Sequence, residues 1–216
     1  MIKKVSNLTF SIYLLISAII FSTLLTLNIS PIIYSLFINS TNLVEINNLT
    51  REELMTDYLN IISYLNHPNK NELIFENFAM SPNGAYHFLE VKLIFSSVYL
   101  IGIACLLLFI FLFISRKKFN LKFSFKALNL FFYEVISICS LILLAFYFNF
   151  SKVFTVFHKI LFNNNYWIFN RKTDPIINAL PESYFMTLGV FALVAIILIA
   201  ILSKLIYISK TKSYKK

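Results

Sequence analysis

Two histidines stand out among the few side chains of this sequence that could move protons at the ends of its apolar segments. His87 comes shortly before one long apolar run, and His158 comes shortly after the next. Imidazole gives and takes protons near neutral pH, so such a pair suits general acid–base chemistry. If these runs cross a membrane in opposite directions, both rings lie at the same water–lipid boundary. We therefore predict that they serve one site; the alternative is that each ring only anchors a helix end.

Other polar side chains fall close to the two histidines along the chain. Glu90 follows His87 by three residues and shares its helix face, so it could orient that ring or pair with Lys92. Its alternative role is a solvated carboxylate favoured by the positive end of a helix. Asp174 precedes a proline, and its simplest role is that of a turn or cap residue. His67 lies in an Asn-His-Pro-Asn turn and is expected to face water.

Common catalytic and cofactor signatures are missing from the sequence. It has no Gly-x-Ser-x-Gly elbow, no His-Glu-x-x-His motif, no close Cys/His cluster and only 3 glycines. We therefore predict no metal and no cofactor. Two histidines could also ligate one haem, but such ligands usually lie deeper in a bundle, beside small residues.

Four apolar segments must position these residues. The chain is 58% hydrophobic and 13% charged, with a mean hydropathy of +0.75, which excludes an ordinary soluble composition. A helix needs about 20 apolar residues to cross a bilayer, and lipid offers its backbone no hydrogen bonds. We predict an all-α membrane protein, a single domain over 1–216, with four transmembrane helices. Their ranges are 8–37, 93–114, 128–150 and 184–206.

The charges predict the orientation of these helices. The net charge is +9, and one set of loops is basic and free of acids. Its bases are Lys3, Lys4, Arg116, Lys117, Lys118, Lys122, Lys126, Lys204, Lys210, Lys212, Lys215 and Lys216. The positive-inside rule then makes both termini cytoplasmic, and it explains the charge without nucleic acid.

The remaining loops follow from this orientation. Residues 115–127 form a cytoplasmic loop, whereas 38–92 and 151–183 form an extracytoplasmic cap. The first apolar run is longer than a secretory signal and lacks a clear cleavage site, so we expect it to stay uncleaved.

The cap carries its own local signals. Thr50 and Glu53 have capping-box spacing, and apolar residues then recur at helical steps as far as Asn66. The segment 81–84 has the composition of a turn. The second cap segment is rich in aromatic residues, and we expect it to be buried in the cap or in the headgroup layer.

Two stretches of the chain resemble a known family. Residues 81–92, SPNGAYHFLEVK, place a histidine before an acid, valine and lysine. Residues 157–185, FHKILFNNNYWIFNRKTDPIINALPESYF, combine Phe-His with Trp, Thr-Asp and Leu-Pro. With the span order and the basic inside loops, they resemble the lipoprotein intramolecular transacylases, which are small four-span bacterial membrane proteins. The sequence departs from that pattern at Glu90, where Asp is expected, at 83–84, where a more helix-favouring pair is expected, and at 170–171, which is often Asp-Pro.

The resemblance implies a reaction as well as a fold. The substrate is a diacylglyceryl lipoprotein at the outer face of the bacterial cell membrane. Its sn-2 acyl chain moves to the α-amine of the N-terminal cysteine, which leaves the lyso-form. The implied catalytic residues are His87 and His158. The expected substrate contacts are Glu90, Lys92, Phe157, Tyr166, Trp167 and Asp174.

The chemistry of these residue types fits that reaction. Ester-to-amide transfer is downhill and needs no nucleotide, and an α-amine with a pKa of about 7.7–8.0 readily gives a proton to imidazole. Reacting groups on one molecule reach effective molarities of about 10⁵–10⁸ M when well oriented, so the enzyme mainly has to fold the substrate headgroup. One histidine takes the amine proton, while the other stabilises the oxyanion and protonates the alkoxide; the sequence does not assign the roles. The rival prediction is a non-catalytic subunit or sensor whose cap binds an envelope protein. A transporter fits less well because the spans lack a polar lining.

Overall fold

The computed structural model describes residues 3–4, 6–118, 121–122 and 124–213. The predicted inside loop therefore contains residues outside the described part, at 119–120 and 123, and the basic residues Lys215 and Lys216 also lie outside it.

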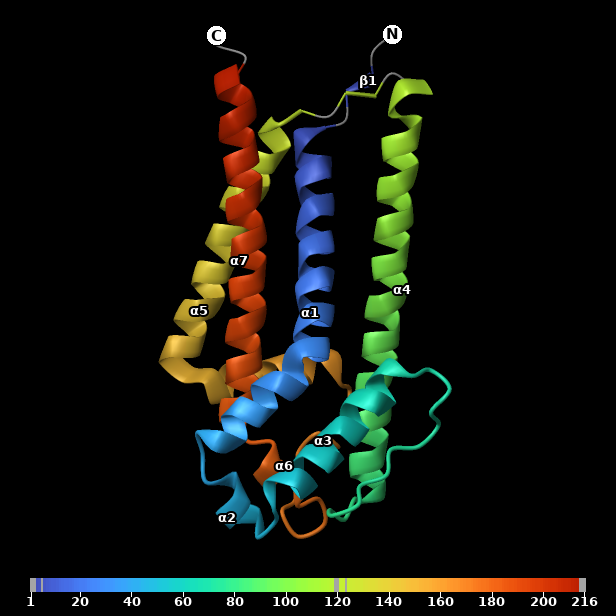
Figure 1. The fold of residues 1–216 in the computed structure, drawn as a ribbon, viewed down its shortest axis with the longest axis vertical. Helices are drawn as coiled ribbons and strands as arrows, with labels where there is room; N and C mark the ends of the chain where they lie inside the picture. The colour runs from blue at the N-terminus through green and yellow to red at the C-terminus, as the bar shows by residue number, and fades with distance from the viewer. Residues whose placement is uncertain (1–2, 5, 119–120, 123, 214–216) are drawn as a thin grey trace. The chain divides into compact units, whose positions relative to one another are not determined.

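Four long helices dominate the chain (Figure 1). Each is long and apolar enough to cross a membrane: α1 Asn7–Asn39, α4 Pro82–Lys118, α5 Lys126–Leu161 and α7 Glu182–Ser213. The predicted all-α membrane fold with four spanning helices is thus confirmed. At 1.5 Å per residue α4 extends about 55 Å, well beyond a ~30 Å hydrocarbon core. The positions where the bilayer begins and ends along each helix stay predictions.

Short elements precede or connect the long helices. They are α2 Leu43–Asn47, α3 Arg51–Asn66, α6 Ile176–Ala179 and the strands β1 Lys3–Lys4 and β2 Leu121–Lys122. The two strands pair in parallel, with Lys3 opposite Leu121. This pairing was not predicted, because two residues are too few to show a strand period.

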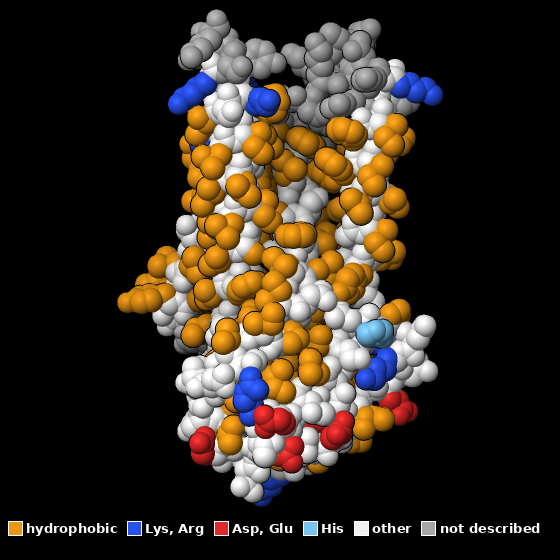
Figure 2. All heavy atoms as spheres, viewed as in Figure 1, with side chains coloured by type: hydrophobic (Ala, Val, Ile, Leu, Met, Phe, Trp, Pro, Cys, Tyr) orange, Lys and Arg blue, Asp and Glu red, His pale blue; other side chains and the backbone are white. Residues whose placement is uncertain are grey.

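The chain forms two compact units, each built from parts of all four long helices. Unit 1 comprises Met1–Leu24, Tyr99–Leu144 and Val190–Lys216, and unit 2 comprises Leu25–Val98 and Ala145–Gly189. On the face drawn in Figure 2, hydrophobic side chains cover the long helices and acidic side chains gather over unit 2. Unit 2 contains both cap segments and both histidines of the predicted site.

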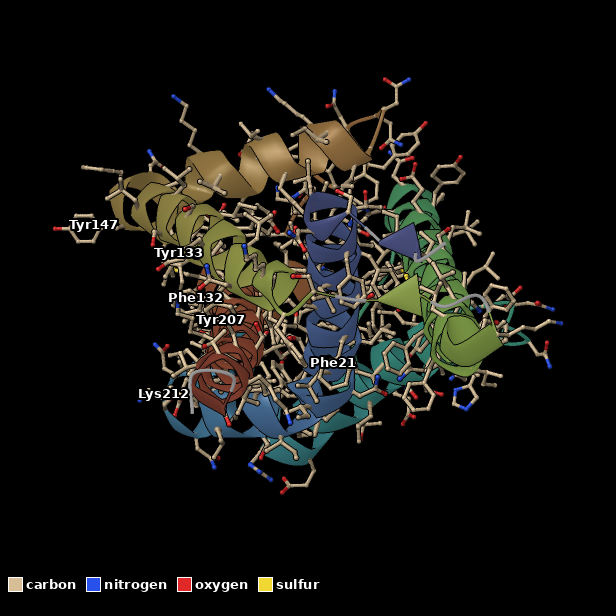
Figure 3. All side chains as sticks on the ribbon, turned by 90° about the horizontal axis from the view of Figure 1, so that it is seen from above. Phe21, Phe132, Tyr133, Tyr147, Tyr207 and Lys212 are labelled. Carbon is tan, nitrogen blue, oxygen red and sulfur yellow. The ribbon has the colours of Figure 1, made fainter. Side chains whose placement is uncertain are left out.

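Unit 1 has few polar contacts. The Ser11 hydroxyl donates to Glu134 Oε1 (2.9 Å), which gives the single acid within a predicted span a local partner. Lys204 Nζ donates to Asn129 Oδ1 and lies 4.6 Å from the centre of the Tyr133 ring. Figure 3 shows that ring beside those of Phe132 and Tyr207, which also face the ammonium. Such contacts hold a cation at low cost.

An apolar pocket of about 330 Å³ also lies within unit 1. It is lined by Leu14, Ser17, Ala18, Phe21, Leu128, Phe131, Ile199 and Ser203. None of these is a predicted site residue, so this pocket is separate from the predicted site.

Unit 2 is organised around α3. The predicted capping box is confirmed, since Thr50 Oγ1 accepts from the Glu53 N–H and the Glu53 side chain accepts from the Thr50 N–H. Asp57 is fully buried, and its two oxygens accept backbone N–H bonds from Glu76 (2.6 Å) and Asn77 (3.0 Å). These bonds tie the extended segment after α3 back onto the helix.

Three tyrosines join α3 to α1 and α7. The Tyr184 hydroxyl contacts that of Tyr58 (2.6 Å), and the Tyr34 hydroxyl donates to the Ala179 carbonyl (3.1 Å). Burial raises the pKa of Tyr58, so its phenol stays neutral and able to share hydrogen bonds. Through the bond from Tyr34 to Ala179, the cluster holds α6, which belongs to the second cap segment, to α1.

Two local features set the start of α4 and the end of α5. The segment predicted as a turn at 81–84 instead begins α4, with Pro82 in the first turn and Ser81 Oγ accepting from the Gly84 N–H (3.0 Å). Proline suits a first helical turn because its missing N–H has no helical partner there. In α5, Asn149 has non-helical backbone angles, so the helix kinks before the segment that carries His158.

Candidate active site

His158 lies in the last turn of α5, within a cluster of aromatic rings. Its Nδ1 lies 2.7 Å from the Phe154 carbonyl oxygen, one turn earlier. Ring centres lie at 4.1 Å for Phe154, 4.9 Å for Trp167 and 5.7 Å for Phe162. The imidazole is therefore fixed at its backbone side and walled by apolar surface.

His87 occupies the second turn of α4 and is only 8% exposed. Its ring meets the edges or faces of Phe162 at 4.7 Å and Phe169 at 5.5 Å. Its Nδ1 is buried and has no hydrogen-bond partner among the described residues. A buried imidazole nitrogen without a partner is costly for folding and is typical of a group that meets a ligand.

The two imidazoles face one another within unit 2. Their ring centres are 6.1 Å apart, with 38° between the ring planes, and both rings contact Phe162. A carbonyl group placed between or beside them can be reached by both. Two histidines that only anchored separate helix ends would not need this convergence.

A single asparagine connects the polar and aromatic sides of the site. Asn164 Nδ2 donates to Glu90 Oε1 (2.7 Å), and its Oδ1 accepts the Tyr166 N–H (2.9 Å). Its backbone carbonyl accepts from Trp167 Nε1 (3.0 Å). The turn that places Trp167 against His158 is thus tied to α4.

Comparison with known proteins places the chain in a family. The model of the family described as lipoprotein intramolecular transacylase Lit matches residues 8–185. The chain belongs to the lipoprotein intramolecular transacylase family. Membership makes this transacylase a multi-pass membrane enzyme whose substrate is a lipoprotein, and the non-catalytic alternative is set aside.

Solved structures show the same fold. The membrane-integral Lit from Bacillus cereus is 28% identical, with a TM-score of 0.87 over 97% of this chain and 95% of that one. Two variants of that protein, with a histidine changed to arginine or to alanine, give TM-scores of 0.76 and 0.75 at 26% and 28% identity. They cover 97% and 96% of this chain and 93% of theirs. No curated protein matches the sequence.

Three predicted substrate contacts lie beside the histidines of the transacylase. Phe157 contacts the His158 ring at 5.6 Å and is 56% exposed, so it can meet a ligand from outside. Trp167 forms part of the wall, and Glu90 sits one helical turn after His87. Tyr166 lies further out, edge-on to Tyr86 at 5.5 Å.

Two other predicted contacts are engaged elsewhere. Lys92 Nζ donates to the Lys70 carbonyl and lies 4.3 Å from the centre of the Tyr64 ring. Asp174 is buried and accepts from the Ser81 N–H (2.7 Å) and from the Thr173 hydroxyl (2.7 Å). Their contact with substrate stays a prediction, while their visible roles are structural.

Several residues around the two histidines were not predicted from the sequence. Asn164 is one of them, although it lies in an Asn-Asn-Asn run, which is typical of side chains that bond to their own turn. The rings that wall the site lie four residues from His158 on either side, so helical spacing could have identified Phe154 and Phe162. Among the described residues, no cluster of three or more His, Cys, Asp or Glu could hold a metal.

Proposed function

We propose that this transacylase moves the sn-2 acyl chain of a diacylglyceryl lipoprotein to the α-amine of its N-terminal cysteine. The product is an N-acylated lyso-form lipoprotein. The site works at the outer leaflet, with both chain termini in the cytoplasm. The observation that carries this proposal is the pair of converging imidazoles, His87 and His158, surrounded by aromatic rings.

The hydrogen bond of His158 supports one of the two possible roles for its ring. A backbone carbonyl only accepts hydrogen bonds, so Nδ1 of His158 carries the proton that it shares with Phe154. In the neutral ring Nε2 then bears the lone pair and can take a proton. We infer that His158 is the general base and that its partner ring is the donor.

The reaction then balances with these two rings alone. His158 Nε2 takes a proton from the amine as the nitrogen attacks the ester carbonyl and forms the new N–C bond. A His87 N–H donates to the oxyanion, and its proton passes to the glycerol oxygen when the C–O bond breaks. The proton held by His158 returns to His87, so the enzyme ends as it began.

The surroundings of the rings favour this chemistry. Burial away from water disfavours a charged group, so we expect both imidazoles to be neutral when substrate binds. A dry site also strengthens the hydrogen bond to the oxyanion. The exposed ring of Phe157 offers apolar surface to the acyl chain, and the bulk of the wall keeps water from competing with the amine.

Alanine substitutions test the pair. His87→Ala and His158→Ala are expressed in a host without its own transacylase, with His67→Ala as the matched control. Mass spectrometry of a reporter lipoprotein's N-terminal peptide then measures the lyso-form. We expect both site variants to lose the product and the control to retain it. Parental conversion by either site variant would overturn the proposal.

A further inference from the structure

The two carboxylate oxygens of Glu90 have different surroundings. Oε1 accepts the Asn164 amide at 2.7 Å, whereas Oε2 is buried and has no hydrogen-bond partner among the described residues. A buried carboxylate oxygen without a donor is expensive, because it has lost water and gained nothing. Since carboxylate oxygens only accept, whatever satisfies Oε2 must be a donor.

The position of Glu90 links it to both histidines. It follows His87 by three residues on α4, so the two side chains share one helix face. Through Asn164 it is also joined to Trp167, whose ring lies 4.9 Å from His158. These links favour a place for the free oxygen in the same site as the two imidazoles.

The nearest basic side chain along α4 does not supply that donor. Lys92 Nζ is engaged by the Lys70 carbonyl and by the face of the Tyr64 ring. The partner of Oε2 is thus expected to come from the substrate.

We propose that Glu90 Oε2 binds the substrate's α-amino group in its cationic form and so selects lipoproteins with a free N-terminus. This inference rests on the proposed function, which brings that amine to the site. Hydrogen bonds between a cation and a carboxylate are about twice as strong as neutral ones. The ammonium first releases one proton to bulk water; the neutral amine then keeps one N–H on Oε2 and gives its other proton to His158 as it attacks. An N-acylated lipoprotein lacks the charge and is rejected.

Unreactive ligands separate binding from chemistry. Two ether-linked dialkyl lipopeptides cannot transfer an acyl chain; one keeps the α-amine and the other lacks it. Their inhibition constants are measured against conversion of a diacyl lipopeptide by the purified full-length protein. We expect the parent to prefer the amine by about tenfold to a hundredfold, as for one hydrogen bond to a charged group.

Glu90→Gln should abolish this preference, since its amide cannot hold a cation equally well. Glu52→Gln is the matched control, because Glu52 is an exposed cap acid and its loss changes the net charge equally. We expect the control to keep the parental ratio. A parental ratio in Glu90→Gln would overturn the inference.

A double variant removes the carboxylate at position 90 while keeping the hydrogen bond between positions 90 and 164. In Glu90→Gln/Asn164→Asp, the amide at position 90 donates to the carboxylate at position 164, and that carboxylate still accepts the Tyr166 N–H. The chain has 1 tryptophan, so Trp167 fluorescence reports whether the wall is intact. We expect parental fluorescence but no amine preference; recovery of the preference would show that the link alone matters. If the single variant does not fold, the double variant carries the test.

The two proposals fail in different ways. A parent protein that makes no lyso-form from the diacyl lipopeptide contradicts the proposed function. A parent that does so, with amine preference unchanged by both Glu90 variants, contradicts only the role of Glu90.

Discussion

The ends of α3 and α5 carry the same local contact in different surroundings. At the end of α3, His67 Nδ1 lies 2.8 Å from the Ser63 carbonyl oxygen; in the last turn of α5, His158 Nδ1 lies 2.7 Å from that of Phe154. His67 is exposed and is followed by a proline turn. His158 is surrounded by rings and faces a second imidazole. The backbone contact selects a tautomer at both places, but the enclosure and the partner ring distinguish the catalytic candidate.

The largest expected effect comes from replacing each of these two histidines by alanine. His158→Ala removes the proposed base, and general acid–base catalysis contributes about 10²–10⁴ in rate, so kcat should fall by that factor. His67→Ala removes an equivalent contact from solvent and should leave kcat within about twofold of the parent. Single-turnover conversion of a diacyl lipopeptide measures both. An equal loss in the two variants would show that the contact, not its surroundings, matters.

The next effect concerns the structural role of α3. Asp57→Asn weakens the acceptance of two backbone N–H bonds by a buried carboxylate, which should lower the free energy of unfolding by about 1–3 kcal/mol. Thermal unfolding in detergent measures the loss. The folded fraction should keep nearly parental kcat, since α3 provides no proposed catalytic group. A large fall in kcat without lost stability would contradict this division.

The smallest expected effect comes from removing one aromatic ring beside His158, which sharpens the contrast with the exposed His67. Trp167→Leu removes one ring contact of His158, worth about 0.5–1.5 kcal/mol, so conversion should slow about threefold to tenfold. Trp167→Phe keeps a ring but loses the hydrogen bond to Asn164. Its conversion rate should therefore lie between that of the parent and that of the Leu variant. Initial rates at saturating substrate rank the three proteins. A Leu variant faster than the Phe variant would argue against an aromatic requirement.

Much of the fold was predictable because its signals are local. Long apolar runs must be helical in lipid, and Thr50 and Glu53 specify a helix start through their own spacing. The turn predicted at 81–84 was wrong because proline and serine also suit a helix start. The pairing of β1 and β2 had no sequence signal.

The site was predictable in part, for a related reason. The histidines could be placed together because span order brings their helix ends to one boundary. The partners of Asn164 could not, because its bond to Glu90 joins residues 74 positions apart. Likewise, nothing local to Asp174 shows that its carboxylate accepts the N–H of Ser81, 93 residues earlier, just before α4 begins at Pro82.

That distant cap restricts what residue 84 can be. A methyl group on Gly84 would overlap the Asp174 carboxylate that holds the start of the helix bearing His87. A larger side chain at position 84 therefore requires a smaller one at position 174. A genetic screen that begins with a damaged Gly84→Ala strain should recover revertants in which residue 174 has become smaller, such as Asp174→Ser.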